Sequence, residues 1–420
     1  MAGESFDCVV VGAGPGGISA ALVMARAGLQ VLVLERGEYP GAKNVMGGLL
    51  FRKSLEGLIP EFWKDAPVER HVTGHELWLT TEDGSVALSY RSTRHDRPPF
   101  NGFTVQRAKF DGWFASNAEQ AGAMVVPKTV VMDLLWEHGR VAGVKTEGEG
   151  PDTEVRAGCV ILADGVNSLL MSKAKLRAHD LKPHQVTLCV KEVIGFPRET
   201  IESRFNLEGD QGLAVQMLGG VTKGLTGMGF LYTNRDSVSV GLGVVLKDLV
   251  SSLVKPYELL EHLKAHPRVR PLIAGGETLE YTAHMIPAGG FPEMPRLAGD
   301  GVLAVGDAGM LVNSVSWEGA NFAMESGRLA GETVVEAKQA GDFSARTLGR
   351  YQGRLEASFV LKDLRHFGNT IPYVETHPHF FGVYPGMAVA AAEEFFTVDG
   401  VPKKEKERKI LRAVHARRPV

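Results

Sequence analysis

The opening stretch, residues 6–36, constrains the fold of this chain most strongly. It begins with an apolar run over residues 6–11, which is typical of a buried parallel strand, and a helix-forming segment follows. Glycines in the spacing GxGxxG separate the two. A second apolar strand over residues 31–34 then ends at Glu35. This order of strand, tight turn, helix, strand and acid predicts a dinucleotide-binding unit at the start of the chain.

Each part of this opening has a separate expected role. Gly12 permits the sharp turn, Gly14 lets a pyrophosphate approach bare backbone, and Gly17 lets the helix pack closely on the strand. The helix N-terminus would bind the pyrophosphate, and Glu35 would accept hydrogen bonds from an adenosine ribose. A structural turn without a nucleotide is the alternative. The cofactor-binding residues predicted here are Gly12, Ala13, Gly14, Pro15, Gly16, Gly17, Glu35 and Arg36.

The composition describes an ordinary α/β protein. Hydrophobic residues make up 44% and charged residues 23%, which excludes disordered and fibrous classes. The formal net charge of −3 is too small to predict a nucleic-acid partner. Glycine, at 50 of 420 residues, is abundant enough to suggest that backbone approaches a ligand at more than one place.

The cysteines and the apolar runs limit the cellular compartment and the kinds of cofactor that can be expected. Cys8, Cys159 and Cys189 are few and scattered, so they form neither a disulfide framework, nor a C-x-x-C pair, nor a ligand set for a [4Fe–4S] cluster. Glu4 stands where a signal peptide would carry positive charge, and no apolar run approaches the roughly 20 residues of a spanning helix. We therefore expect a cytoplasmic protein, compatible with peripheral binding to the inner face of the cell membrane.

Two later strands repeat the logic of the opening. The apolar run at residues 160–162 leads into Asp164, and the run at residues 302–305 leads into Asp307. A carboxylate at the end of a parallel strand lies where open α/β sheets bind ligands, although an aspartate there can also be a helix N-cap. A flavin dinucleotide is long enough to need both ends, whereas NAD needs only the opening turn. The predicted contacts are Asp164, Gly165, Gly306 and Asp307.

Three further segments are candidates for the same ligand. Gly47 and Gly48 belong to a loop that either folds over the reactive ring or merely connects two elements. Arg107 precedes an amphipathic helix and is either a phosphate or ribityl partner or a surface charge. A helix starts near Glu318, and its N-terminus would favour negative charge on a flavin's pyrimidine edge. The predicted contacts at that helix start are Gly319, Ala320 and Asn321.

The rest of the chain indicates a second domain and a helical end. Residues 76–90 are typical of a hairpin, and residues 175–295 of a mostly antiparallel sheet with one helix. The expected domains are 1–174, 175–295, 296–340 and 341–420. The basic tail from residue 403 carries eight Lys or Arg against two Glu, and is either a solvated helix face or a docking site for anionic lipid or an acidic partner. Three histidines near residues 366–379 lack the spacing of a metal site, so no metal is predicted.

These motifs together carry a family resemblance that covers essentially the whole chain. GAGPGGISAA, LERG, the Arg-x-x-Phe-Asp-x-Trp motif at Arg107, ADGVNS, VGDAGM and EGANFAMESGRLAGE resemble the FAD-binding family of aromatic monooxygenases and geranylgeranyl reductases. Within it, GAKNVMGGLL and the C-terminal half are most similar to the short FixC (EtfC) type of electron-transfer flavoprotein:quinone oxidoreductase. The resemblance implies a glutathione-reductase-type FAD-binding Rossmann domain, an inserted antiparallel-sheet substrate domain and a helical C-terminal region.

The resemblance also implies roles for individual residues. Arg107 matches an arginine near the cofactor, Val130 a backbone contact to adenine, and Asp307 the ribityl-binding aspartate. Gly319 to Asn321 match the turn beside the flavin ring, and no residue is assigned as a catalytic acid or base. Two departures stand out: no proline follows Asp307 before Asn321, and the four-cysteine cluster domain of the longer quinone oxidoreductases is missing.

The function implied is electron transfer to a membrane quinone. Electrons would come from a two-subunit electron-transfer flavoprotein of the FixA/FixB kind, through a ferredoxin-like FixX-type subunit that carries the iron–sulfur cluster, and the chain would be the quinone-reducing subunit of an electron-bifurcating, NADH-oxidising complex. Prenyl reduction or aromatic hydroxylation by an FAD enzyme is one alternative. An FAD-bearing scaffold subunit without redox turnover is the other.

Overall fold

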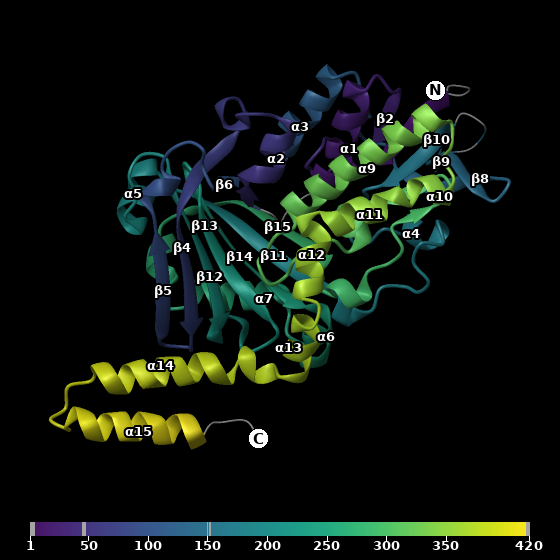
Figure 1. Ribbon diagram of the computed structural model, residues 1–420. Coiled ribbons are helices and arrows are strands. Elements are labelled where there is room, and N and C mark those ends of the chain that lie inside the picture. Colours follow the sequence, from purple (N-terminus) through teal and green to yellow (C-terminus); the bar gives the residue numbers. More distant parts are fainter. Residues whose placement is uncertain (1–4, 44–47, 149, 151–152, 417–420) are drawn as a thin grey trace. The chain divides into compact units, whose positions relative to one another are not determined.

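The computed structural model describes residues 5–43, 48–148, 150 and 153–416 (Figure 1). Contacts among residues divide the chain into two compact units. Unit 1 comprises Met1–Val68, Val105–Val186 and Met285–Ile371, and unit 2 comprises Glu69–Thr104, Thr187–His284 and Pro372–Val420. Each unit is thus assembled from three separate segments of the chain.

Unit 1 contains a mainly parallel sheet with helices. Its elements are β1 (Ser5–Val11), α1 (Pro15–Arg26), β2 (Val31–Leu34), β3 (Leu49–Phe51), α2 (Arg52–Leu58), α3 (Arg107–Gln120), β7 (Met124–Val126), β8 (Val131–Glu137), β9 (Arg140–Thr146), β10 (Glu154–Leu162), α4 (Leu170–Lys173), β16 (Ala298–Gly299), β17 (Val302–Ala304), the 3₁₀ turn η7 (Gly306–Gly309), α9 (Ala320–Ala340), α10 (Ala345–Leu348), α11 (Arg350–Ala357) and α12 (Phe359–His366). Helix α13 (Thr370–Thr376) spans the boundary between the segments of the two units.

The sheet of unit 1 has the strand order β16-β17-β10-β1-β2-β7, and β9 and β8 extend it from β10 as an antiparallel meander. Strands β1, β2, β7, β10 and β17 are mutually parallel. The inner strands β1 and β2 are almost entirely buried, which explains their continuous apolar sequence, because parallel strands are covered on both faces. The predicted opening of strand, turn, helix and strand is therefore confirmed.

Glycines allow helices α1 and α9 to pack side by side (Figure 1). A Cβ atom at Gly327 would lie 2.0 Å from the carbonyl oxygen of Gly16, and one at Gly331 would lie 2.9 Å from that of Ala20. Such distances are shorter than any normal contact. The close approach joins the opening turn to a helix that the chain forms almost three hundred residues later.

Unit 2 is built on a mostly antiparallel sheet. Its elements are β4 (Val68–Thr80), β5 (Ser85–Arg91), β6 (Gly102–Val105), β11 (Val186–Gly195), α5 (Arg198–Phe205), β12 (Gln211–Gly219), β13 (Gly227–Thr233), β14 (Ser237–Val245), α6 (Leu246–Ser252), α7 (Pro256–Ala265), α8 (Arg270–Ile273), β15 (Glu277–Pro287), α14 (Val383–Phe396) and α15 (Lys403–Ala416). The strands follow the order β15-β11-β14-β13-β12-β4-β6, and β5 pairs with β4 as the predicted hairpin.

The two units divide the chain at other positions than the boundaries expected at residues 174, 295 and 340. Residues 69–104 belong to unit 2 because β4 pairs in parallel with β12, which lies far away in the sequence. Helices α14 and α15 also belong to unit 2, where α14 contacts β5 and β12. The hairpin β4–β5 is readable from the local sequence, whereas its long-range partner is not.

Buried polar side chains in unit 2 are bonded to its own backbone. Arg70 is 1% exposed, and its guanidinium donates to the carbonyl oxygens of four residues and lies 3.6 Å from the carboxylate of Glu202. The four acceptors are Asn234, Gly209, Gln211 and Arg235. Asn234 is equally buried and its Nδ2 donates to the hydroxyls of Ser237 and Ser239, at 3.1 and 3.0 Å. These groups hold the strands of the sheet together.

The C-terminal segment of unit 2 is a helical hairpin of α14 and α15 (Figure 1). Lys406 closes the connection between them, because its ammonium donates to the carbonyl oxygen of Thr397 at 2.7 Å and pairs with Asp399 at 2.8 Å. The end of α14 and the connection expose apolar side chains, with Phe396 at 76% and Val398 at 90%. None of the described helices is both long and apolar enough to span a bilayer.

Candidate cofactor site

The register of the sheet brings four predicted motifs to one edge of unit 1. Val11 at the end of β1 is aligned with Leu34 of β2 and with Leu162 of β10, and Leu162 is aligned with Ala304 of β17. The segments that follow these residues therefore leave the sheet at the same edge. They carry the glycine turn, Glu35, Asp164 and Asp307. The expectation that distant strand ends share one ligand-binding edge agrees with this register.

The turn between β1 and α1 has the geometry that its glycines predict. Gly12 has φ +102°, and a Cβ there would lie 2.4 Å from the carbonyl oxygen of Ala163. A Cβ at Gly17 would lie 2.1 Å from the carbonyl oxygen of Gly12, so only glycine lets α1 approach the turn this closely. Gly14 is the N-cap of α1, with Pro15 and Gly16 in the first turn, and no side chain of the described chain caps this helix start. Its N–H groups remain available to an anion.

Glu35 is joined directly to the glycine turn. Its Oε2 accepts a hydrogen bond from the N–H of Ala13 at 2.9 Å, and its Oε1 accepts from Gly37 at 2.6 Å. These bonds fix the carboxylate at the end of β2 beside the helix start. Each oxygen keeps a lone pair for a further donor such as a ribose hydroxyl. Arg36 is exposed, and its charge acts on Asp164.

Asp164 follows β10 in a turn that continues through Gly165, which has φ +80°. Burial raises the pKa of Asp164 to about 6, against the opposing effects of Ser168, Arg177 and Arg36. Its Oδ1 is buried without a hydrogen-bond partner in the described chain. Arg177 donates from Nη2 to the carbonyl oxygen of Ser168, whereas its buried Nε and Nη1 have no partner there.

Asp307 lies in η7 directly after β17, next to Gly306, which has φ +56°. Burial raises the pKa of the Asp307 carboxyl to about 6, although the positive charge of Arg107 opposes this rise. Arg107 is the first residue of α3, and its Nε and Nη2 form a two-point ion pair with buried Asp111 at 2.7 and 2.8 Å. Burial alone would lower the pKa of Arg107, but Asp111 makes the net shift upward, so the guanidinium stays charged beside Asp307.

The start of α9 is a second helix N-terminus without a side-chain cap in the described structure. Gly319 is the N-cap and Ala320 is the first helical residue. Asn321 is 6% exposed, and its Nδ2 donates to the carboxylate of Glu318. Because the uncapped N–H groups give this end a partial positive charge, it suits a ligand that becomes more negative on reduction.

The remaining predicted contacts lie in connecting segments. The carbonyl oxygen of Gly48 accepts a hydrogen bond from Val105 at 2.9 Å, and that of Val130 accepts from Glu147 at 2.9 Å. The carbonyl of Val130 is thus already engaged, which leaves its N–H group for the proposed adenine contact. Gly47 lies outside the described residues.

The distribution of unsatisfied polar atoms tests whether a dinucleotide fits these residues. Nine buried side-chain polar atoms have no hydrogen-bond partner in the described structure, and six of them follow β10 or β17. Those six belong to Asp164, Ser168, Arg177, Asn313 and Ser316. Buried polar groups are normally bonded, so a cluster of exceptions at the predicted edge indicates that a ligand supplies the partners. The residues present fit a long cofactor with several polar groups.

The predicted contacts did not include Asp111, Arg177 or Asn313, although the motif at Arg107 contains Asp111. Asp111 carries a usable signal, because an acid four residues after Arg107 lies on the same face of a helix. Arg177 and Asn313 carry none, since their proximity to the strand ends depends on the path of the connecting loops.

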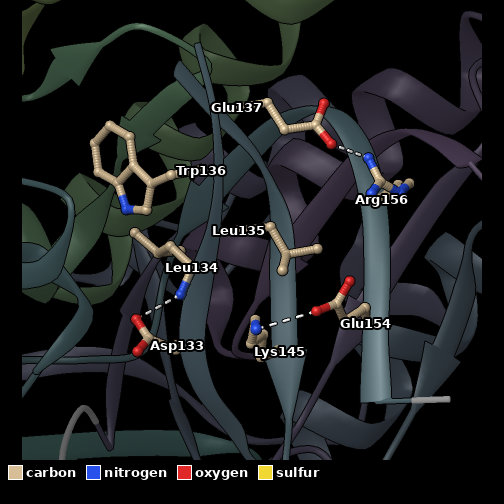
Figure 2. A pocket seen from close by; sticks show the side chains of 8 residues that line it. All are labelled: Asp133, Leu134, Leu135, Trp136, Glu137, Lys145, Glu154 and Arg156. Atoms are coloured by element: carbon tan, nitrogen blue, oxygen red, sulfur yellow. Dashed lines mark hydrogen bonds and ion pairs between the residues drawn. The ribbon is translucent and has the colours of Figure 1, made fainter. Parts of the chain in front are cut away.

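A surface depression elsewhere in unit 1 does not have these properties. Figure 2 shows its lining on β8, β9 and β10, where Lys145 pairs with Glu154 at 3.0 Å and Arg156 pairs with Glu137. Trp136 lies beside them and faces the ammonium of Lys175, 5.0 Å from its ring centroid. Two ion pairs join four of the five charged side chains in this depression, and the fifth, Asp133, pairs with Lys173 at 3.3 Å. The depression shares no residue with the predicted cofactor contacts.

Comparisons with known proteins agree with this geometry. Residues 7–175 match the family model of FAD dependent oxidoreductases, residues 190–286 match the ubiquinone-binding model of ETF-QO, and residues 372–420 match the C-terminal domain of the ETF-QO/FixC family. The first match contains the glycine turn, Glu35, Arg107 and Asp164. The second lies in a part of the chain that forms most of the sheet of unit 2.

Full-length relatives identify the family. The chain is 46% identical over 416 residues to a protein named FixC from Azorhizobium caulinodans, covering 98% of this chain and 95% of the relative. It is 44% identical over 414 residues, with the same coverage, to the probable electron transfer flavoprotein-quinone oxidoreductase YdiS of Escherichia coli. A geranylgeranyl bacteriochlorophyll reductase-like structure from Thermoplasma acidophilum shares the fold, with a TM-score of 0.71 and 21% identity over 99% of this chain and 100% of that one. The chain belongs to the ETF-QO/FixC family of FAD-dependent oxidoreductases.

Proposed function

We propose that this chain passes electrons to a quinone by way of FAD held in unit 1. The observation that carries the proposal is the set of unsatisfied polar atoms after β10 and β17, beside the uncapped start of α1. FAD accepts and releases electrons singly or in pairs, which is the chemistry that such a transfer needs. The match of residues 190–286 to a ubiquinone-binding model supports quinone as the acceptor.

In this proposal the residues of the chain position the cofactor and set its potential. The start of α1 would hold the pyrophosphate, Glu35 the adenosine ribose, Asp307 the ribityl chain, and the start of α9 the flavin ring. The pair of Arg107 and Asp111 keeps a fixed positive charge beside Asp307, which favours the ionised carboxylate as an acceptor for hydroxyl groups. None of these residues has to transfer a proton for electrons to move.

The donor side of the proposal follows from the cysteines. Three cysteines are too few to ligate a [4Fe–4S] cluster, and all three are buried in strands. We infer that electrons arrive from a two-subunit electron-transfer flavoprotein of the FixA/FixB kind through a ferredoxin-like, FixX-type subunit. The chain would then be the quinone-reducing subunit of an electron-bifurcating complex that oxidises NADH. The name of the Escherichia coli relative supports an electron-transfer flavoprotein as the donor.

The proposal also places unit 2 at a membrane surface through the hairpin of α14 and α15. The end of α14 exposes Phe395 and Phe396, the connection exposes Val398, and α15 begins with Lys403 and Lys404. Exposed apolar residues next to basic ones are typical of contacts with anionic lipid. A peripheral contact of this kind would give the chain access to a lipid-soluble quinone.

Reoxidation kinetics test the electron-transfer proposal. The FAD-loaded chain is reduced anaerobically and mixed in a stopped-flow instrument with a short-chain quinone or with oxygen. We expect fast reoxidation by the quinone and slow reoxidation by oxygen. Rapid reoxidation by oxygen with hydroxylation of an aromatic compound would favour the hydroxylase instead, and a flavin that never changes redox state during turnover would favour a scaffold. Purification from the native host should retain the flavoprotein and ferredoxin-like subunits.

Vesicle binding tests the membrane contact. The double variant Phe396→Ser with Val398→Ser should lose most of its binding to vesicles that contain anionic lipid. Leu88→Ser is the matched control, because Leu88 of β5 is 72% exposed and lies outside the helical hairpin of α14 and α15. Equal binding by all three proteins, or none by the unmodified chain, would contradict the contact.

A further inference from the structure

Asn313 is a buried residue to which neither the sheet nor the predicted cofactor contacts assign a role. It lies in the connection between η7 and α9 and is 2% exposed. Its side-chain oxygen accepts hydrogen bonds from the N–H groups of Val315 at 3.1 Å and Ser316 at 3.3 Å. Its Nδ2 has no partner among the described residues. The side-chain oxygen of Asn313 therefore stabilises the loop, whereas its NH₂ group donates no hydrogen bond among the described residues.

The orientation of the amide is fixed by these bonds. If the side chain were flipped, its NH₂ group would face two backbone N–H donors, which cannot accept a hydrogen bond. The oxygen must therefore face Val315 and Ser316, and the NH₂ group must point away from them. The fold itself therefore leaves the NH₂ group of Asn313 as the donor without a partner among the described residues.

The loop that carries Asn313 is closed by hydrogen bonds of its own backbone. The N–H and carbonyl groups of Asn313 and Glu318 bond to each other in both directions, each at 3.1 Å. Trp317 has φ +58°, a left-handed conformation that is uncommon for a large side chain and that clusters at functional sites. The carboxylate of Glu318 in turn accepts from Asn321 of α9. This closure holds Asn313 in place between Asp307 and the start of α9.

A second unused group lies in the same loop. The hydroxyl of Ser316 is buried and has no partner in the described structure. Two such groups in one preformed loop are unusual, because buried donors are nearly always satisfied. The loop connects two segments that the proposed function assigns to the ribityl chain and to the ring of FAD. A ligand there would present ring carbonyl oxygens, which accept hydrogen bonds.

We propose that Asn313 donates a hydrogen bond from Nδ2 to a carbonyl oxygen of the flavin ring, and that Ser316 adds a second, weaker contact. This inference rests on the proposed function, since it needs FAD in unit 1. It assigns to the connection between η7 and α9 a polar contact with the ring.

The substitution Asn313→Asp tests the donor alone. It keeps the oxygen that binds Val315 and Ser316 and replaces the NH₂ group with an oxygen. At pH 8 we expect FAD affinity, measured by flavin fluorescence titration, to fall about tenfold, the loss expected when a hydrogen bond is replaced by an unsatisfied acceptor. The midpoint potential of the bound flavin should become more negative, because a carboxylate beside the ring opposes the gain of electrons.

Asn234→Asp is the matched control. Asn234 is as deeply buried as Asn313, but its Nδ2 is already bonded to Ser237 and Ser239, so the same substitution should leave FAD affinity and potential unchanged. Ser316→Ala should weaken FAD binding about threefold, less than Asn313→Asp does.

Three outcomes overturn the inference without overturning the proposed function. They are unchanged FAD affinity and potential in Asn313→Asp, effects of the same size in Asn234→Asp, and a change confined to the KM for quinone. In each case the unmodified chain still binds FAD and reduces quinone. An unmodified chain that takes up no FAD would instead overturn the proposed function itself.

Discussion

Two pairs of residues with buried side-chain nitrogen atoms show how the units of this protein differ. Arg70 and Asn234 in unit 2 donate hydrogen bonds to backbone carbonyl and hydroxyl groups of their own unit. Arg177 and Asn313 in unit 1 leave donors buried and unused. The residue types are the same. The acceptors around each side chain decide whether its donors stabilise the fold or are available to a ligand.

The difference teaches where to look for function in a fold of this kind. A buried charge that is fully bonded stabilises the protein only while all its partners are present, and its loss is costly. A buried charge without partners costs stability in the free protein and is retained for what it binds. Substitutions that treat the two classes alike should therefore give opposite results.

Arg70→Met should have the largest effect. It removes the guanidinium and leaves buried carbonyl oxygens without donors, so we expect unit 2 to lose about 3–5 kcal/mol of unfolding free energy. Urea denaturation followed through the fluorescence of Trp78, which is buried in the core of unit 2, measures this loss. Arg198→Met, a change of an exposed neighbour that also pairs with Glu202, is the control and should change stability little. Equal effects of the two would break the comparison.

The pH dependence of stability should be the next largest effect. The pKa of Asp307 is raised from 3.8 to about 6 in the folded protein, so the folded state binds more protons than the unfolded state between these values. Its contribution to stability is therefore present at low pH and is lost as the pH rises from about 4 to about 6. In FAD-free protein, Asp307→Asn should gain about 2 kcal/mol over the unmodified chain across this range. Denaturation curves at pH 4 and pH 7 test it, and a constant difference would contradict it.

Asp307→Ala should separate ligand binding from stability. We expect FAD affinity to fall by about 30-fold, because a charged hydrogen-bond partner of the ribityl chain is lost, while the FAD-free protein keeps or gains stability. Flavin fluorescence titration and thermal unfolding measure the two properties. Asp342→Ala is the control: its carboxylate accepts from Ser344 and Thr347, so it should lower stability and leave FAD affinity unchanged. A parallel loss of both properties in Asp307→Ala would assign it to the fold.

Arg177→Met should have the smallest effect and the sharpest contrast with Arg70→Met. Two of its buried nitrogen atoms lack partners, so an apolar side chain of similar volume should leave the FAD-free protein within about 1 kcal/mol of the original. FAD affinity should fall about tenfold if the guanidinium binds the cofactor. Destabilisation as large as that of Arg70→Met would remove the distinction between the two units.

Much of the cofactor site was predictable from the sequence because its signals are local. The glycine turn, Glu35 and the two strand-end aspartates are read from short motifs, and the parallel register then places them at one edge. The partners were not predictable where they depend on loops or on distant pairing. Arg177 approaches Asp164 only through the path of the chain after β10, and β4 joins β12 only in the folded sheet.

The contact between α1 and α9 sets the time at which the protein can acquire its cofactor. The backbone of Gly16 packs against Gly327, and β17 can pair with β10 only after more than 300 residues of the chain have been made. When the ribosome has made β1 and α1, the partners β17 and α9 that complete the cofactor site have not yet been synthesised. Retention of FAD becomes a late event of synthesis, and a truncated product that ends before α9 should leave the ribosome colourless.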